Sequence, residues 1–205
     1  MSTRELRPLN LGPDVLARLL PHRRPFLMVD RITHFAAGPE PRLRAERYIS
    51  AADPIFEGHF PELHLWPGVY IQEGLGQSCG LLLTLLGLQA HYVATLRDPD
   101  EPLRALANLE LGYRLHPGFQ ADDAASFLSA MVPPAAFMGM AASVDMKFLA
   151  PVFAGQRLDY DVRRTDVIGD MVRCDIEAFV GKDTVARGTM TSKMGVRLPG
   201  AKVPR

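Results

Sequence analysis

The alternation of apolar and polar residues predicts most of the secondary structure in the C-terminal third of the chain. Four stretches alternate with a period of two, as half-buried strands do: 144–148, 158–167, 172–180 and 185–194. The last three are separated by short turns rich in Gly and Asp, which indicates successive antiparallel strands. In the stretch 172–180 every second residue is apolar and charged residues stand between them, so the sheet has one buried and one solvated face.

The N-terminal half predicts two helices and a hairpin. Apolar residues recur at helical spacing over 14–20 and, in a longer run, over 69–86, with Gly87 near the end of that helix. Between the helices, the runs 26–29 and 43–49 are expected to form two paired strands. We therefore expect a long helix to cover the buried face of an antiparallel sheet.

Three interior glycines distinguish the long helix. Gly74, Gly76 and Gly80 together cost roughly 2–3 kcal/mol of helix propensity relative to alanine. Such a sequence is favourable only where another element packs very close to the helix, and the apolar face of the sheet is the obvious candidate.

The stretch 88–141 separates the long helix from the last strands and contains several proline-rich breaks. Its pattern predicts two short helices, over 103–111 and 122–131. Spacing alone assigns no chemistry to it.

Composition limits the class of protein. The chain has 205 residues, of which 47% are hydrophobic and 22% charged, as expected for one folded globular domain. Lys plus Arg and Asp plus Glu each total 23, and this balance argues against a broad nucleic-acid-binding surface. We find neither a signal peptide nor an apolar run of the roughly 20 residues that span a membrane. With only two cysteines, the sequence favours the cytoplasm.

His59 and Glu73 are the candidate proton-transfer residues. His59 lies in an irregular loop, and Glu73 follows 14 residues later, one turn into the long helix. A histidine and a carboxylate beside the free backbone N–H groups of a helix start can move protons and polarise an acyl oxygen. A loop histidine more often holds a turn, so the spacing alone leaves both readings open.

Four sequence blocks change that balance. With these blocks, which occur in the same order as in that family, the chain resembles the 3-hydroxyacyl-acyl-carrier-protein dehydratases of the FabZ type. The blocks are 20–31 (LPHRRPFLMVDR), 58–61 (GHFP), 67–73 (PGVYIQE) with Gln77, and 147–152 (KFLAPV) with Gly155. The resemblance implies an α+β hotdog fold, in which an antiparallel sheet wraps around one long central helix. It also implies that residues 1–205 form a single hotdog domain, with 88–141 as an enlarged insertion after the helix.

The resemblance also assigns roles to individual residues. It implies that His59 is the catalytic histidine and Glu73 the acid partner, which reaches the site from the other subunit. The Gly68 position offers its backbone N–H to the thioester carbonyl. Gln77 supports the carboxylate, and the carbonyl of Leu65 orients the histidine.

The chain departs from the family pattern in the loop 62–66, which reads ELHLW. The family commonly has Gly, a further Pro and Met there, so the loop that carries His59 is expected to have a different shape. We expect the bulky Trp66 to bind substrate by reshaping the acyl tunnel. The insertion 88–141 is interpreted as a lid, a tunnel wall or a partner surface, or else as a surface ornament.

The reaction implied is elimination of water from a 3-hydroxyacyl thioester, on acyl carrier protein or CoA, to give a trans-2-enoyl thioester for fatty-acid or polyketide-like biosynthesis. His59 would take the C2 proton and Glu73 would protonate the leaving hydroxyl. The expected partners are the acyl carrier protein, a second copy of the chain, or a hotdog partner subunit. No cofactor or metal is implied. The alternatives are a hotdog acyl thioesterase and a non-catalytic acyl-binding subunit.

Several other residues have plainer interpretations. Ser78 lies in a G-x-S-x-G pattern but within a helical stretch, which argues against a serine hydrolase. His22 is expected in the turn before the first strand, and Cys79 and Cys174 as packed thiols. Five arginines could meet an acidic carrier protein, although scattered arginines more often form a solvated face: Arg23, Arg24, Arg42, Arg44 and Arg47.

Overall fold

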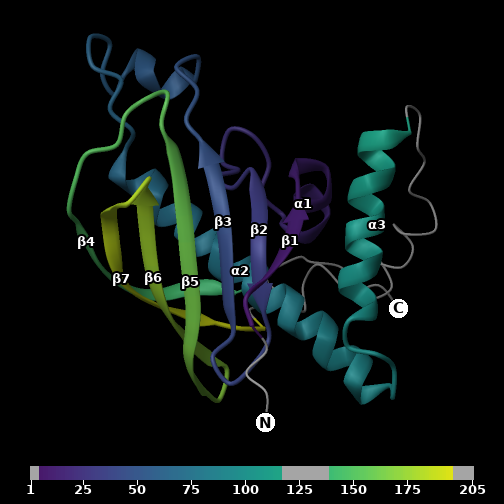
Figure 1. The fold of residues 1–205 in the computed structure, drawn as a ribbon. Coiled ribbons are helices and arrows are strands. Elements are labelled where there is room, and N and C mark those ends of the chain that lie inside the picture. Colours follow the sequence, from purple (N-terminus) through teal and green to yellow (C-terminus); the bar gives the residue numbers. More distant parts are fainter. Residues whose placement is uncertain (1–4, 117–138, 196–205) are drawn as a thin grey trace, which may run out of the picture.

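A computed structural model describes residues 5–116 and 139–195 of the chain. One antiparallel sheet of order β1-β2-β3-β5-β6-β7-β4 packs against the long helix α2 (Figure 1). The elements are β1 (Arg7–Leu11), α1 (Pro13–Leu19), β2 (Arg31–Ala36), β3 (Arg42–Tyr48), the 3-10 helix η1 (Pro54–Glu57), α2 (Gly68–Ala94), α3 (Glu101–Leu115), β4 (Met140–Phe148), β5 (Arg157–Ile168), β6 (Met171–Val180) and β7 (Asp183–Lys193). This is the predicted hotdog arrangement.

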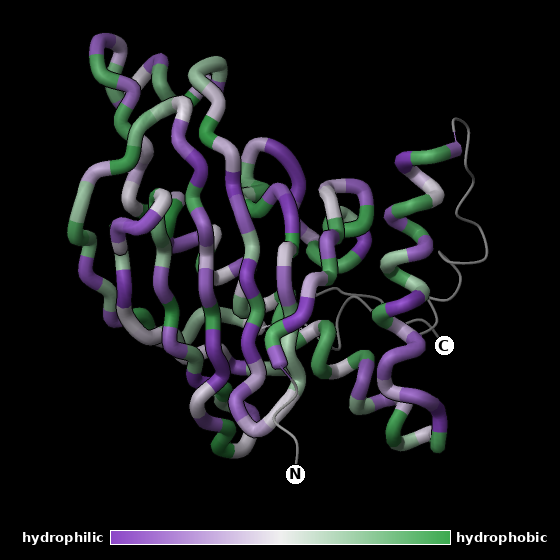
Figure 2. Tube along the Cα trace, viewed as in Figure 1, coloured by the Kyte–Doolittle hydropathy of each residue, from purple (hydrophilic) through white to green (hydrophobic). Residues whose placement is uncertain are grey.

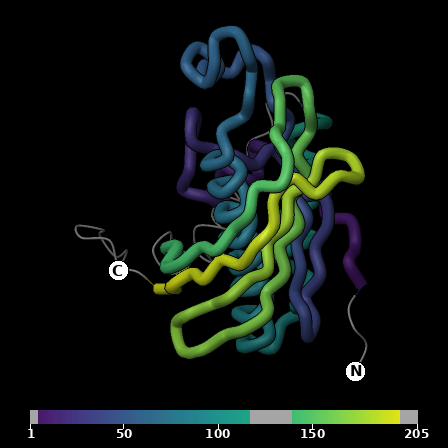
Figure 3. The backbone as a smooth tube through the Cα atoms, turned by 90° about the vertical axis from the view of Figure 1, so that its left-hand side faces the viewer, coloured from purple at the N-terminus to yellow at the C-terminus, as the bar shows by residue number. Residues whose placement is uncertain are grey.

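The two faces of the sheet differ as the alternation predicts. On β6, the side chains of Val172, Cys174 and Ile176 are buried, whereas Arg173 between them is exposed. Figure 2 shows the resulting alternation of apolar and polar residues along the strands. Viewed from the side, the C-terminal strands lie next to each other in one layer with α2 behind them (Figure 3). The buried face of the sheet and α2 therefore share one hydrophobic core.

The closest approach of helix to sheet is at Gly74. A Cβ atom there would lie 2.3 Å from the hydroxyl oxygen of Tyr160, a buried residue of β5. At Gly76 and Gly80 the nearest atoms would be 3.5 and 3.9 Å away, which is ordinary van der Waals contact. The predicted close packing is thus confirmed at Gly74, whereas Gly76 and Gly80 could each accept a Cβ atom without a clash.

The first predicted strand was placed too early. Residues 26–29 are not a strand, because the backbone N–H of Met28 is bound by the side chain of Gln77 rather than by a neighbouring strand. The ladder with β3 begins at Arg31, so the predicted hairpin exists with its first strand displaced along the chain. Strand β1, which pairs with β2, was not predicted because its sequence RPLNL has no clear alternation.

Helix α2 is longer than predicted and continues through Gly87 to Ala94. Its added turns bury Leu88 and Tyr92, so tertiary packing compensates for the helix-breaking tendency of the glycine. Within the described ranges, no helix combines the length and hydropathy needed to cross a membrane.

Helix α3 confirms the first helix predicted in the stretch 88–141, whereas the second, 122–131, lies outside the described residues. Leu103, Leu106 and Leu109 of α3 belong to the main core. A buried carboxylate also fixes the helix, because Glu110 accepts a hydrogen bond of 2.9 Å from the Gly12 N–H at the start of α1. This part of the stretch is therefore integral to the fold and not a surface ornament.

Candidate active site

The loop before α2 holds the ring of His59 in one orientation. The backbone N–H groups of Gly58 and His59 both donate to the carbonyl of Ile55, which closes the loop after η1. The Nδ1 atom of His59 lies 2.8 Å from the carbonyl oxygen of Leu65. A carbonyl oxygen only accepts hydrogen bonds, so Nδ1 must carry the proton, and in the neutral ring Nε2 keeps a free lone pair. The ring is therefore set up to accept a proton at Nε2.

The residues after His59 are tied to the segment that follows β4. The Trp66 N–H donates to the carbonyl of Val152 at 2.7 Å, and the Ala154 N–H donates to the carbonyl of His64 at 3.0 Å. The Trp66 ring is buried and packs edge-on against Tyr70, with the Arg47 guanidinium above it. The structure thus places this ring in the core, and it does not line the cavity described below.

Helix α2 begins at Gly68 with its first amides unobstructed. The preceding Pro67 provides no side-chain cap, and within residues 5–116 and 139–195 the Gly68 N–H has no hydrogen-bond partner. A Cβ atom at Gly68 would lie 3.0 Å from the ring of Phe148, so a larger residue would crowd this position. A free amide at the positive end of a long helix is a suitable donor for an oxygen that gains negative charge.

Gln77 positions Glu73 one turn earlier on α2. Its side-chain amide donates to Glu73 Oε1 at 3.0 Å and to the carbonyl of Phe26 at 2.6 Å. Its own oxygen accepts the Met28 N–H at 2.9 Å. The buried Gln77 is thus fixed by backbone groups on one side and holds the carboxyl group on the other.

Glu73 and Gln77 lie at one end of a cavity of about 450 Å³ between α1, α2, β4 and β7. His22, which was expected only to form a turn, shares this polar end, and Gly76 and Gly80 leave room along the helix. The remaining wall is mostly apolar and includes Leu19, Leu20, Leu83, Met140, Met190 and Met194. The cavity has the lining expected for an acyl chain with a reactive group at one end.

His59 does not line this cavity, and the structure of one chain does not bring it into contact with Glu73. His59 lies on the loop that precedes α2, whereas Glu73 lies in the second turn of α2 and lines the cavity.

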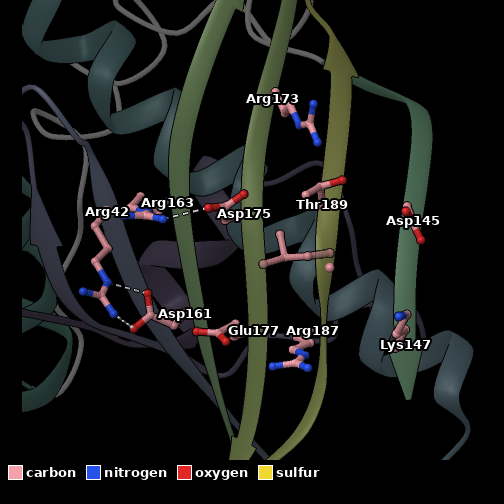
Figure 4. A pocket seen from close by; sticks show the side chains of 12 residues that line it. Arg42, Asp145, Lys147, Asp161, Arg163, Arg173, Asp175, Glu177, Arg187 and Thr189 are labelled. Carbon is pink, nitrogen blue, oxygen red and sulfur yellow. Dashed lines mark hydrogen bonds and ion pairs between the residues drawn. The ribbon is translucent and has the colours of Figure 1, made fainter. Parts of the chain in front are cut away.

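A larger cavity of about 570 Å³ lies on the solvated face of the sheet and is lined mostly by charged residues (Figure 4). Arg42 contacts Asp161 through two hydrogen bonds of 2.6 Å, and Arg163 donates to Asp175 at 2.8 Å. The hydrogen bond to Asp161 raises the pKa of Arg42. Ion pairs of this kind stabilise a solvated sheet face and do not suit an acyl chain.

The other candidates have structural roles. Ser78 lies within α2, and its buried hydroxyl donates to the Gly74 carbonyl at 2.7 Å, so the G-x-S-x-G pattern is not a nucleophile turn. Cys79 and Cys174 are buried free thiols. Their mutual hydrogen bond, together with burial, raises the pKa of Cys79 well above its ordinary value, which disfavours the reactive thiolate.

Comparison with known proteins supports the FabZ-type resemblance. Residues 20–97, which include His22, His59, Glu73 and Gln77, match the family model of the FabA-like domain. The chain is 48% identical over 79 residues to the 3-hydroxyacyl-[acyl-carrier-protein] dehydratase FabZ of Tolumonas auensis (38% of this chain, 51% of the relative). It is 49% identical over 70 residues to that of Thermotoga petrophila (34% and 49%). The chain spans about half the length of these curated relatives.

One solved structure extends the likeness beyond the matched segment. The chain resembles a chain of the dehydratase heterocomplex ApeI:P from Xenorhabdus doucetiae, with a TM-score of 0.52 and 14% sequence identity, over 87% of this chain and 90% of the other. At this identity the likeness shows the fold alone. The hotdog architecture therefore extends over most of the chain, whereas the sequence similarity is concentrated on the segment with the candidate site.

Proposed function

We propose that this chain dehydrates 3-hydroxyacyl thioesters and that two copies combine to form each active site. The observation that carries the proposal is the placement of Glu73, held by Gln77 in a cavity whose lining is mostly apolar. An acyl chain fits the apolar part, and its C3 hydroxyl then comes to the carboxyl group. The printed names of the curated relatives support the same reaction.

The elimination uses a base, an acid and an oxyanion donor. His59 accepts the C2 proton at Nε2, whose lone pair is free because Nδ1 is bound to the Leu65 carbonyl. The electron pair of the C2–H bond becomes the C2–C3 double bond as the C3–O bond breaks. Glu73 in its acid form protonates the leaving hydroxyl, so water departs. The Gly68 N–H stabilises the negative charge that develops on the thioester oxygen.

An exposed apolar rim supports assembly from two copies. Phe60, Leu63, Val69, Phe148 and Leu149 are 48–66% exposed and border the loop of His59, the start of α2 and the end of β4. We call these five residues the apolar rim. Within residues 5–116 and 139–195, strand β4 is also an edge of the sheet, so one row of its backbone groups has no strand partner there. A second copy seated on the rim would cover it and bring its own Glu73 cavity to His59.

The carrier of the acyl group is proposed to be acyl carrier protein or CoA. Of the arginines named in the sequence, Arg42 and Arg44 bind Asp161, Arg47 binds Asp30, and Arg23 binds backbone carbonyl groups. Arg24 has no ion pair within the described part of the chain and is exposed next to the cavity residues His22 and Arg23. It is the arginine best placed to meet a phosphate or an acidic carrier.

The test measures two products from one reaction. Purified protein is given a 3-hydroxyacyl thioester on acyl carrier protein or on CoA, and the conjugated enoyl product and free thiol are followed together. We expect enoyl formation, which His59→Ala and Glu73→Gln abolish. The exposed residues His91 and Glu40, which line neither the loop of His59 nor the cavity, provide matched controls, because His91→Ala and Glu40→Gln remove the same groups elsewhere.

The alternatives give different results in the same experiment. Thiol release without an enoyl product would show a thioesterase. Binding of the thioester without either product would show a non-catalytic acyl-binding subunit. Either result overturns the dehydratase proposal.

A further inference from the structure

His22 lies at the polar end of the cavity and faces the proposed general acid. It belongs to the segment between α1 and β2, and its Nε2 atom lies 3.6 Å from Glu73 Oε1. Its own neighbours hold it in place: Arg23 donates to the His22 carbonyl at 2.7 Å, and the ring of Phe26 lies 6.2 Å away, centroid to centroid. The sequence resemblance includes this histidine and implies no role for it.

The two oxygens of Glu73 have different surroundings. Oε1 accepts the Gln77 side-chain amide at 3.0 Å, and His22 Nε2 approaches the same atom. Within the described residues, no donor contacts Oε2. Because Oε1 already accepts the Gln77 amide and faces His22, the acid proton of Glu73 is better placed on Oε2.

The surroundings of His22 select one tautomer of the neutral ring. Its Nδ1 atom is buried and has no hydrogen-bond partner in the described part of the chain. Buried N–H groups without a partner are rarer in folded proteins than unpaired acceptors. The ring therefore keeps its proton on Nε2, directed at Glu73. The other titratable groups that line the cavity, Arg18 and Arg23, bind the Tyr113 hydroxyl and backbone carbonyl groups.

We propose that His22 is a positioning residue for the acid step, donating through Nε2–H to Oε1 of Glu73. Together with Gln77 it fixes the carboxyl group so that Oε2 delivers the proton to the leaving hydroxyl. The separation of 3.6 Å is longer than a formed hydrogen bond, and contacts of this kind commonly shorten when substrate binds. The inference rests on the proposed dehydratase function.

The test changes the leaving group. Fluoride departs with the C–F electron pair and needs no proton, so elimination from a 3-fluoroacyl thioester requires the base His59 but not the acid Glu73. His22→Leu is expected to slow dehydration of the 3-hydroxyacyl thioester about tenfold, the effect of losing one hydrogen bond. It should leave fluoride elimination unchanged. Glu73→Gln should show the same selectivity more strongly, and His59→Ala should lose both reactions.

Two further variants separate positioning from packing. His22→Gln retains an N–H donor near the position of Nε2 and should recover most of the dehydration rate. His91→Leu removes an exposed histidine near the end of α2, away from the cavity, and should change neither reaction. Thermal unfolding of each variant is measured alongside the rates.

The outcomes distinguish the inference from the function on which it rests. If wild-type protein forms no enoyl product from either substrate, the proposed function fails and this role with it. If wild-type protein is active and His22→Leu slows both eliminations equally, His22 acts through packing alone. If His22→Leu slows neither, it has no part in the acid step. Either of the last two results overturns the inference about His22 and leaves the proposed dehydratase function standing.

Discussion

Replacing Gly74 by Ala places one methyl group at the closest contact between α2 and the sheet. The new Cβ would lie 2.3 Å from the hydroxyl oxygen of Tyr160 and 2.4 Å from the ring carbon that bears it. Real Cβ contacts essentially never fall below 3.0 Å, so one partner must move. Tyr160 is 1% exposed in the middle of β5, and a ring packed on all sides has no free space to enter. We therefore expect α2 to move away from the sheet.

The size of the effect follows from two opposing contributions to the free energy of unfolding. Overpacking a filled core costs about 1–3 kcal/mol, whereas Ala in place of Gly gains about 1 kcal/mol of helix propensity. Gly80→Ala is the matched control on the same helix, since its Cβ would meet nothing closer than 3.9 Å. It gains the same propensity without the clash. The two variants should therefore differ by about 1–3 kcal/mol, with Gly74→Ala the less stable.

Urea unfolding followed by circular dichroism measures this difference directly. The free energy of unfolding should fall with urea concentration at the wild-type slope in both variants. The urea concentration at the unfolding midpoint should be lower for Gly74→Ala than for Gly80→Ala. Because Glu73 is the adjacent residue, Gly74→Ala should also slow the proposed dehydration. Equal midpoints for the two variants would refute the close approach of α2 to β5.

Three further changes probe other buried groups. Glu110→Gln should lower the free energy of unfolding by about 1–3 kcal/mol and speed hydrogen exchange in α1 and α3, because a buried charge holds the Gly12 N–H; unchanged exchange would contradict this. Cys79 and Cys174 should react with a thiol reagent only after unfolding, because both thiols are buried; rapid reaction of native protein would contradict it. Burial raises the pKa of the Tyr160 hydroxyl above its ordinary 10.0. The stability that the neutral side chain contributes is therefore complete below pH 10.0 and is lost as the pH rises above that value. Tyr160→Phe should reduce this alkaline loss in urea unfolding, and an unchanged loss would count against it.

The sequence predicted those elements whose period is regular. Strands β5, β6 and β7 alternate cleanly because one face is buried, and their positions were predicted to within a few residues. The prediction of a strand over 26–29 is wrong because a short apolar stretch has no period of its own, and the side chain of Gln77 takes the place of a strand partner for Met28. The end of α2 was missed because burial of its last turns outweighs the propensity of Gly87.

The candidate site was predictable only in its parts. The family-like blocks place His59 and Glu73 near the start of α2, but no spacing shows that Glu73 lines the cavity while His59 does not. His22 was assigned to a turn because one histidine in a loop carries no signal of its own. Its contact with Glu73 depends on how the segment after α1 folds across α2, which is a tertiary feature.

The central claim is that His59 of one copy works with Glu73 of another, and mixing two inactive variants tests it most directly. His59→Ala and Glu73→Gln chains are co-refolded, with distinguishable tags to confirm that mixed dimers form. In a mixed dimer with shared sites, one site carries both lesions and the other carries none. Random pairing should then restore about a quarter of wild-type dehydratase activity. A mixture that contains mixed dimers and stays inactive would contradict the account.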